Sequence, residues 1–140
     1  MITNDGLTYL LNVALSNGTK YGTWYIGLIH ATNFAGCAIA DTLPSHGGWE
    51  EGNEYAETAR QVWSNGGAVG EATGTTAVAT FTITQDTVFK GFFLASSNTK
   101  GGTSGVLLAT ALFQGGDQQL LAGQQLQINF QLTAQDASAS

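Results

Sequence analysis

Charged side chains are scarce in this sequence of 140 residues, which has four lysines and arginines and ten aspartates and glutamates. A typical soluble domain carries a charge on about a quarter of its residues, and those charges keep it soluble as a monomer. Here threonine, serine, asparagine, glutamine and glycine fill most polar positions. Because the centre of a protein interface is also depleted of charge, the composition predicts a subunit that lies against neighbouring subunits.

Basic residues are the scarcest charged type and they never cluster. They are Lys20, Arg60, Lys90 and Lys100, and the formal net charge is −6. An acidic chain without a basic patch repels phosphate. We therefore expect no nucleic acid among its partners.

Cysteine occurs once, as Cys37, so the chain can form neither an internal disulfide nor a thiolate zinc site. We expect Cys37 to be a structural thiol. The densest acidic cluster does not have the spacing of an EF-hand calcium loop, and it consists of Glu50, Glu51, Glu54 and Glu57. We therefore expect no metal ion and no cofactor.

Long apolar runs are also missing, since none approaches the about 20 residues of a membrane span. Asn4 and Asp5 stand where a secretory signal would carry positive charge. We therefore expect no membrane partner and synthesis in the cytoplasm, with export only as part of a larger particle.

The first 20 residues have the pattern of one helix, predicted from Asn4 to Gly18 with Asn4 or Asp5 as its cap. Its apolar residues recur at intervals of three and four, and they are Leu7, Leu10, Leu11, Ala14 and Leu15. Two interpretations remain open. The helix packs over the open end of a β domain, or residues 1–20 are an arm that docks on another subunit.

The remainder of the chain predicts strands. Residues 24–30 are apolar on both faces, as in a strand covered on both sides. Residues 76–84 and 125–133 alternate between apolar and polar. Residues 88–95 and 106–113 are nearly continuous apolar runs. Residues 31–53 predict a long loop, and residues 54–63 predict an extended edge segment.

Short strands at this spacing with glycine turns and one helix predict an all-β, antiparallel sandwich or barrel. No composition break or internal repeat marks a second domain, so we expect a single domain over residues 1–140. Residues 134–140 are expected to form a flexible tail.

One loop holds the residue types of a hydrolytic triad, with Asp41, Ser45 and His46 close in sequence and His30 before them. No nucleophile-elbow sequence accompanies them, and such groupings often arise by chance. We expect no enzyme. A small hydrolase that uses His46 is the remaining catalytic hypothesis.

Arg60 is the only arginine and follows the acidic cluster closely. Its rigid fork of donors suits an ion pair. Arg60 therefore forms either an exposed salt bridge with Glu54 or Glu57, or an anchor that holds the region from 49 to 63.

The aromatic residues also have two interpretations, a sugar-stacking platform or anchors of a core or interface. They are Trp24, Tyr25, Trp49, Tyr55 and Trp63.

Several of these segments together resemble a known family. In chain order they are Trp24-Tyr25-Ile26-Gly27-Leu28, Asp41-Thr42, Ser45-His46-Gly47-Gly48-Trp49-Glu50, Tyr55, Arg60 and Ser97-Asn98-Thr99-Lys100-Gly101-Gly102. The chain resembles the capsid cement, or decoration, proteins of tailed bacteriophages. That resemblance implies a jelly-roll β-sandwich, a homodimer, and binding outside a shell of HK97-like major capsid proteins. It also implies that Trp49, Tyr55 and Arg60 are framework residues of loops and carries over no catalytic residue.

Our leading hypothesis is a virion structural protein on the outer capsid surface, which bridges major capsid proteins. The alternative is a carbohydrate- or receptor-binding β-sandwich module of a phage fibre. Exposed, coplanar Trp49 and Trp63 would favour the alternative, and their burial at a subunit seam would favour cement. The candidate capsid or dimer contacts are Leu7, Leu10, Leu11, Trp49, Tyr55, Arg60 and Trp63.

Overall fold

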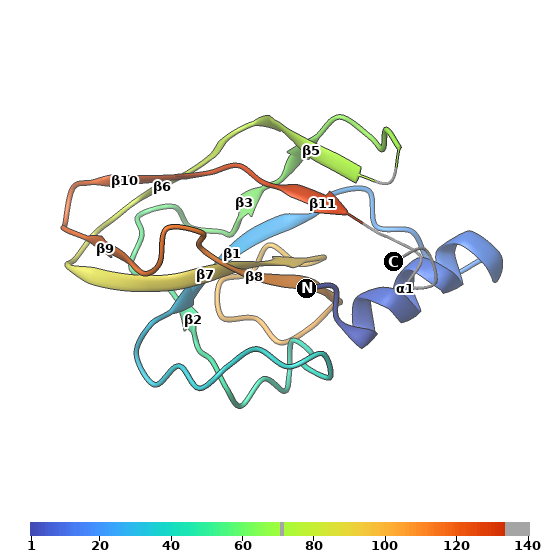
Figure 1. The fold of residues 1–140 in the computed structure, drawn as a ribbon, viewed down its shortest axis with the longest axis horizontal. Coiled ribbons are helices and arrows are strands. Elements are labelled where there is room, and N and C mark those ends of the chain that lie inside the picture. The colour runs from blue at the N-terminus through green and yellow to red at the C-terminus, as the bar shows by residue number, and fades with distance from the viewer. Residues whose placement is uncertain (71, 134–140) are drawn as a thin grey trace.

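The computed structural model describes residues 1–70 and 72–133. Within them one helix, α1 (Asn4–Leu15), precedes eleven strands whose pairs are all antiparallel (Figure 1). The strands are β1 (Tyr25–His30), β2 (Glu51–Gly52), β3 (Gln61–Val62), β4 (Ser64–Asn65), β5 (Ala72–Ala77), β6 (Ala79–Thr82), β7 (Thr87–Ala95), β8 (Leu107–Leu112), β9 (Gln118–Leu120), β10 (Gln125–Ile128) and β11 (Gln131–Thr133). The prediction of an all-β chain with one N-terminal helix and antiparallel sheets is confirmed. The jelly-roll order of its connections stays a prediction.

The largest sheet has the strand order β2-β1-β7-β8, with β3 also on β1 and β9 also on β7. Both of its faces are covered, as the sequence predicted for residues 24–30. Ile26 and Leu28 belong to one buried cluster and Ile29 to another. Between Ile26 and Leu28 the chain has Gly27, where a Cβ would collide with the ring of Phe93.

The first face packs against β6 and β10, which run along one side of the central sheet in Figure 1. Every second residue of these strands points inward, as their alternating pattern predicted. Phe81, Leu126 and Ile128 are buried, while Gln125 and Gln127 are exposed. This alternation places one apolar layer on the sheet and leaves amide side chains outside.

Both long alternating segments are broken, which corrects the prediction of one strand over 76–84 and one over 125–133. Val78 separates β5 from β6, and Asn129 and Phe130 separate β10 from β11. The two halves of each segment join different sheets. As a result Ala77 is exposed, although the alternation had placed it in the core.

A side chain takes over the hydrogen bonds at the break. The Thr75 hydroxyl accepts from the Phe130 N–H and donates to the Phe130 carbonyl, each at 3.0 Å. It also accepts from the Trp63 ring nitrogen at 3.0 Å. A hydroxyl can form these bonds in addition to the main-chain ladder, so the N–H and carbonyl of Phe130 keep partners where the strand direction changes.

The second face of the central sheet is covered by the loop that follows β1. Leu43 and Trp49 of this loop pack on Ile29, Phe93 and Leu107. The predicted loop over 31–53 contains only the short strand β2, and the expected edge segment over 54–63 forms strand only at β3. The loop therefore supplies part of the core on this face of the sheet.

The helix begins and ends differently from the prediction. Its N-cap is Thr3, whose hydroxyl accepts from the Gly6 N–H at 2.9 Å, and not Asn4 or Asp5. The Asp5 carboxylate instead accepts from the Leu107 N–H at 3.1 Å. The helix stops at Leu15, before Gly18, and Asn17 adopts a left-handed φ of 56°.

The predicted tail, residues 134–140, lies outside the described residues. Among the residues that are described, no helix has the length and apolar character needed to cross a membrane.

Candidate interaction surface

Helix α1 touches its own domain through a narrow strip. Gly6 lies directly on β8, because a Cβ at this position would collide with the Leu108 carbonyl. One and two turns further on, Tyr9 and Val13 are half-buried. The Tyr9 ring lies 5.5 Å from that of Tyr21 and 5.1 Å from that of Trp24, between centroids. The inner face of the helix is thus Gly6, Tyr9 and Val13.

The predicted leucine stripe lies on the opposite face. Leu7 is 43% exposed, Leu10 38%, Leu11 59% and Leu15 79%. Exposed apolar residues are normal when scattered, but a contiguous group on one helix face marks an interaction site. We call Leu7, Leu10, Leu11 and Leu15 the outer leucine face. Helix α1 therefore packs on the β domain through its other face, and docking of the outer leucine face on another subunit stays a prediction.

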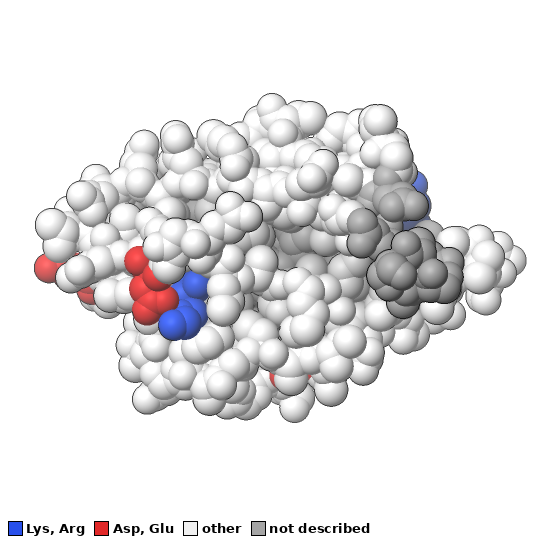
Figure 2. Space-filling model, in the orientation of Figure 1, with Lys and Arg blue, Asp and Glu red and all other residues white. Residues whose placement is uncertain are grey.

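Few charges interrupt the surface. Figure 2 shows one face of the molecule, on which charged atoms form only small groups and one of these has acidic and basic atoms side by side. One partly exposed ion pair joins Lys90 and Asp117, with 3.1 Å between the Nζ and Oδ1 atoms. A surface of this kind loses little hydration energy when it is covered.

Arg60 is an internal anchor. It is 2% exposed, and its fork binds both oxygens of the Glu51 carboxylate at 2.9 and 2.7 Å. It also donates to the carbonyls of Ser97 and Gly102 at 2.9 and 3.0 Å. Its guanidinium carbon lies 5.1 Å from the centre of the Phe93 ring. The anchor interpretation is confirmed, whereas the exposed pair with Glu54 or Glu57 is wrong because the partner is Glu51.

The expectation that Trp49, Tyr55, Arg60 and Trp63 contact a capsid or a second subunit is corrected. All four are at most 5% exposed and belong to the interior of a single chain. Trp49 donates to the Asp41 carboxylate at 3.0 Å, and Trp63 stacks on Phe130 with centroids 4.7 Å apart. Because these faces are already covered, they form neither an exposed sugar platform nor a contact surface. Of the candidate contacts, Leu7, Leu10 and Leu11 remain accessible.

The acidic cluster is divided among separate internal partners. Glu51 binds Arg60, Glu54 lies 3.0 Å from the His30 ring nitrogen, and Glu57 accepts from the N–H and hydroxyl of Thr82 at 2.8 and 2.9 Å. Across residues 1–70 and 72–133, no three histidine, cysteine or acidic side chains gather in a way that could hold a metal ion.

Glu57 has a shifted acidity. Burial acts to raise the pKa of its carboxyl, but the two hydrogen bonds from Thr82, one from its own main chain and the nearby Lys100 together outweigh burial, so the pKa is lowered. The carboxylate form of Glu57 therefore contributes to holding this segment against β6.

Tyr55 and Lys100 form a second internal group. Lys100 donates to the carbonyls of Tyr55 and Glu57 at 2.9 and 3.0 Å, and its nitrogen lies 3.8 Å from the centre of the Tyr55 ring. The Tyr55 hydroxyl is buried and has no hydrogen-bond partner among the described residues. Burial, with nearby Glu51, raises the pKa of this phenol well above its usual range. Burial likewise raises the pKa of the half-buried Cys37 thiol.

The residues of the hydrolytic hypothesis have other partners. The His46 ring stacks on Trp49 at 3.8 Å, and its Nδ1 donates to the Trp49 carbonyl at 2.8 Å. Asp41 accepts from the Ala38 N–H at 2.7 Å as well as from Trp49. Within the described part of the chain, His46 forms no hydrogen bond with Asp41 or Ser45.

A groove between β8 and the segment from Asn129 to Leu132 was not predictable from the sequence pattern. Its volume is about 580 Å³. The alternating pattern of residues 125–133 predicted one continuous strand in which Phe130 and Leu132 are core residues, so it gave no sign of a groove at these side chains. The break after Ile128 turns these side chains to the edge of the core, where they are half-buried.

Comparison of the sequence with models of known protein families finds no match, and comparison with curated proteins finds none either.

Proposed function

We propose that this chain is a capsid cement, or decoration, protein of a tailed bacteriophage. In this proposal it binds the outside of an HK97-like capsid shell, bridges major capsid proteins and forms homodimers. The observation that carries the proposal is the outer leucine face of α1, which has no use inside the chain's own described fold. The family resemblance of the loop segments supports the same function.

The energetics favour assembly through this face. Complete burial of one leucine stabilises a complex by about 1.5–3 kcal/mol relative to leaving it in water. Four leucines on two turns of one helix offer several such contributions, while the poverty of charge nearby keeps the desolvation cost small. Repeated modest contacts on a lattice then add up to strong retention through effective concentration.

The acidic net charge suits an exterior position. A net charge of −6 disfavours contact with packaged or host nucleic acid. A shell reinforced from outside by such a protein resists internal pressure without trapping its genome.

The alternative of a carbohydrate- or receptor-binding module loses its main support. That hypothesis needed Trp49 and Trp63 as an exposed, coplanar pair, and both are buried. They lie inside the chain's own core and not at a known seam, so the cement hypothesis depends on α1 instead.

The test is retention of the chain on shells of the HK97-like major capsid protein encoded in the same genome. We expect wild-type protein to sediment with the shells and the double variant L7Q/L11Q to lose at least about tenfold in retention. Glutamine has a helix propensity close to that of leucine, so α1 is preserved. The matched control is Leu121→Gln, which changes a leucine that is 51% exposed elsewhere.

Two results would overturn the proposal. One is wild-type protein that stays in the supernatant at every concentration tested. The other is specific binding to a glycan array by protein that ignores the shells, which favours the alternative. Sedimentation equilibrium of the free protein separately tests the homodimer.

A further inference from the structure

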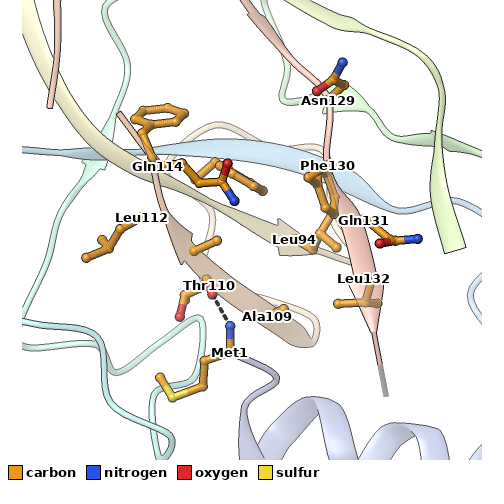
Figure 3. A pocket seen from close by; sticks show the side chains of 13 residues that line it. Met1, Leu94, Ala109, Thr110, Leu112, Gln114, Asn129, Phe130, Gln131 and Leu132 are labelled. Atoms are coloured by element: carbon orange, nitrogen blue, oxygen red, sulfur yellow. Dashed lines mark hydrogen bonds between the residues drawn. The ribbon is translucent and has the colours of Figure 1, made fainter. Parts of the chain in front are cut away.

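The groove between β8 and the Asn129–Leu132 segment has an apolar floor. Phe92 lines the groove, and its ring centroid lies 4.8 Å from that of Phe130. Leu94 and Phe130 lie at its floor, while Met1 stands at the end next to α1 (Figure 3). A smaller hollow of about 240 Å³ continues it past Phe113 and Gln114. Among the described residues, no lysine, arginine, aspartate or glutamate lines either part, and the charged group at the rim is the Met1 α-ammonium, which donates to the Thr110 carbonyl at 2.6 Å.

One rim of the groove is an edge strand that already binds an extended segment. The Thr3 N–H donates to the Leu108 carbonyl at 3.0 Å, and the Thr110 N–H donates to the Met1 carbonyl at 2.9 Å. Main-chain groups of an antiparallel strand alternate in direction. Leu112 is therefore the next residue to face outward, and among residues 1–70 and 72–133 nothing pairs with the β8 edge at this point.

The opposite rim is also an edge. Among the described residues, β10 pairs only with β6 and β11 only with β5. The N–H and carbonyl of Phe130 both point to that side, where they bond to Thr75. By the same alternation, Asn129 and Gln131 turn their main-chain groups toward the groove.

Two rows of main-chain donors and acceptors thus face each other across an uncharged apolar floor. Unpaired strand edges are templates for another strand, and added strands are a common mode of peptide recognition. A sugar would be recognised by amide side chains and aromatic faces, and it would make no use of two rows of main-chain donors and acceptors. We propose that the groove binds an extended, uncharged segment of a partner polypeptide, which pairs as an added strand with β8 at Leu112 and packs alternate apolar side chains on Phe92 and Phe130.

The experiment titrates 15N-labelled protein with the peptide acetyl-Thr-Val-Thr-Val-Thr-Val-Thr-amide and follows the amide resonances of Leu112, Gln114, Asn129 and Gln131 by NMR. The control peptide has the same sequence with N-methyl groups on its valines, which removes the donors of one edge and keeps every side chain. We expect saturable shifts with the first peptide and none with the second. Equal binding of the two peptides would overturn strand addition.

A matched pair of variants tests the β8 edge. Leu112→Pro and Leu112→Ala both remove the leucine side chain, but only proline also removes the outward N–H. Proline is tolerated in an edge strand when its missing donor faces solvent. Because one net hydrogen bond corresponds to roughly a factor of ten in affinity, we expect Leu112→Pro to bind the peptide at least about tenfold more weakly than Leu112→Ala.

Equal affinity of these two variants, or no peptide binding at millimolar concentration, contradicts the proposal. Shifts of the same resonances by neutral oligosaccharides but not by the peptide identify a sugar site instead. The proposed capsid function is tested separately, because its experiment measures how well variants of the outer leucine face are retained on shells. A chain that binds the peptide but no shell keeps this inference and loses the other.

Discussion

The surroundings of Arg60 and the outer face of α1 use their side chains in opposite ways. Arg60 has a carboxylate, two carbonyls and an aromatic ring as partners, all from its own chain. The outer leucine face has exposed side chains with no comparable packing among the described residues. Residues with specialised chemistry therefore hold the loops in place, while the four leucines of α1 stay exposed. The type of a residue alone therefore does not show whether it contacts a partner, because that depends on its contacts within the fold.

The strongest test of this contrast is Arg60→Ala. Loss of the guanidinium leaves the Glu51 carboxylate, whose side chain is 8% exposed, without its partner. Removal of one member of a buried ion pair costs about 3–5 kcal/mol, so we expect that loss in the free energy of unfolding, measured in urea. Lys20→Ala, at an exposed lysine, is the control. A loss below about 1 kcal/mol for Arg60→Ala would refute the anchor role.

The two faces of α1 give the next largest difference. Val13→Gln places an amide against the domain and should destabilise the fold by about 1 kcal/mol, because a half-buried valine loses its apolar contact. Leu11→Gln should change stability by less than about 0.5 kcal/mol, as surface substitutions do. Thermal or urea unfolding of both variants checks this order. A larger effect at Leu11 would mean that the outer face is packed.

Glu57 provides a smaller, pH-dependent effect. Its lowered pKa in the folded chain means that its carboxylate stabilises the fold above the ordinary carboxyl pKa of about 4.3, and that this contribution is lost as the pH falls through the folded value. We expect Glu57→Gln to be less stable than wild type at pH 7 and to approach it in acid. A constant difference between pH 7 and pH 3 in urea melts is inconsistent with this cause.

The smallest effect is expected at Tyr55. Its buried hydroxyl has no hydrogen-bond partner among the described residues, so Tyr55→Phe removes a desolvated polar group and keeps the ring between Phe81 and Lys100. We expect a change near zero or a slight gain in stability. A loss above about 1 kcal/mol would show that the hydroxyl has a partner, such as a buried water.

The sequence predicted the elements well where a single periodicity applies. The buried strand β1, the apolar strands β7 and β8 and the helix α1 all follow their patterns. The breaks at Val78 and at Asn129–Phe130 were not predictable, because each segment keeps its alternation while the Thr75 side chain redirects the hydrogen bonds. Arg60 was identified as a special residue, but its partner depended on tertiary contacts with Glu51, Ser97 and Gly102.

Sequence periodicity also did not show which of the candidate contact residues are exposed, because exposure depends on tertiary contacts. Leucine periodicity predicted a stripe on α1 but not which face would lie on the sheet. Gly6 decides this, because only a residue without a side chain allows the helix backbone to rest on Leu108. Aromatic residues such as Trp49 give equal signals in a core and in an interface, so the sequence alone did not separate the two.

The proposed function requires that the outer leucine face of α1 is covered when the protein binds capsid shells. Hydroxyl-radical footprinting of the free and the shell-bound protein measures this directly through the oxidation of Leu7, Leu10 and Leu11. We expect strong protection of these three leucines in the bound state, with Leu121 labelled equally in both. Equal labelling of the three leucines in shell-bound and free protein would contradict the claim.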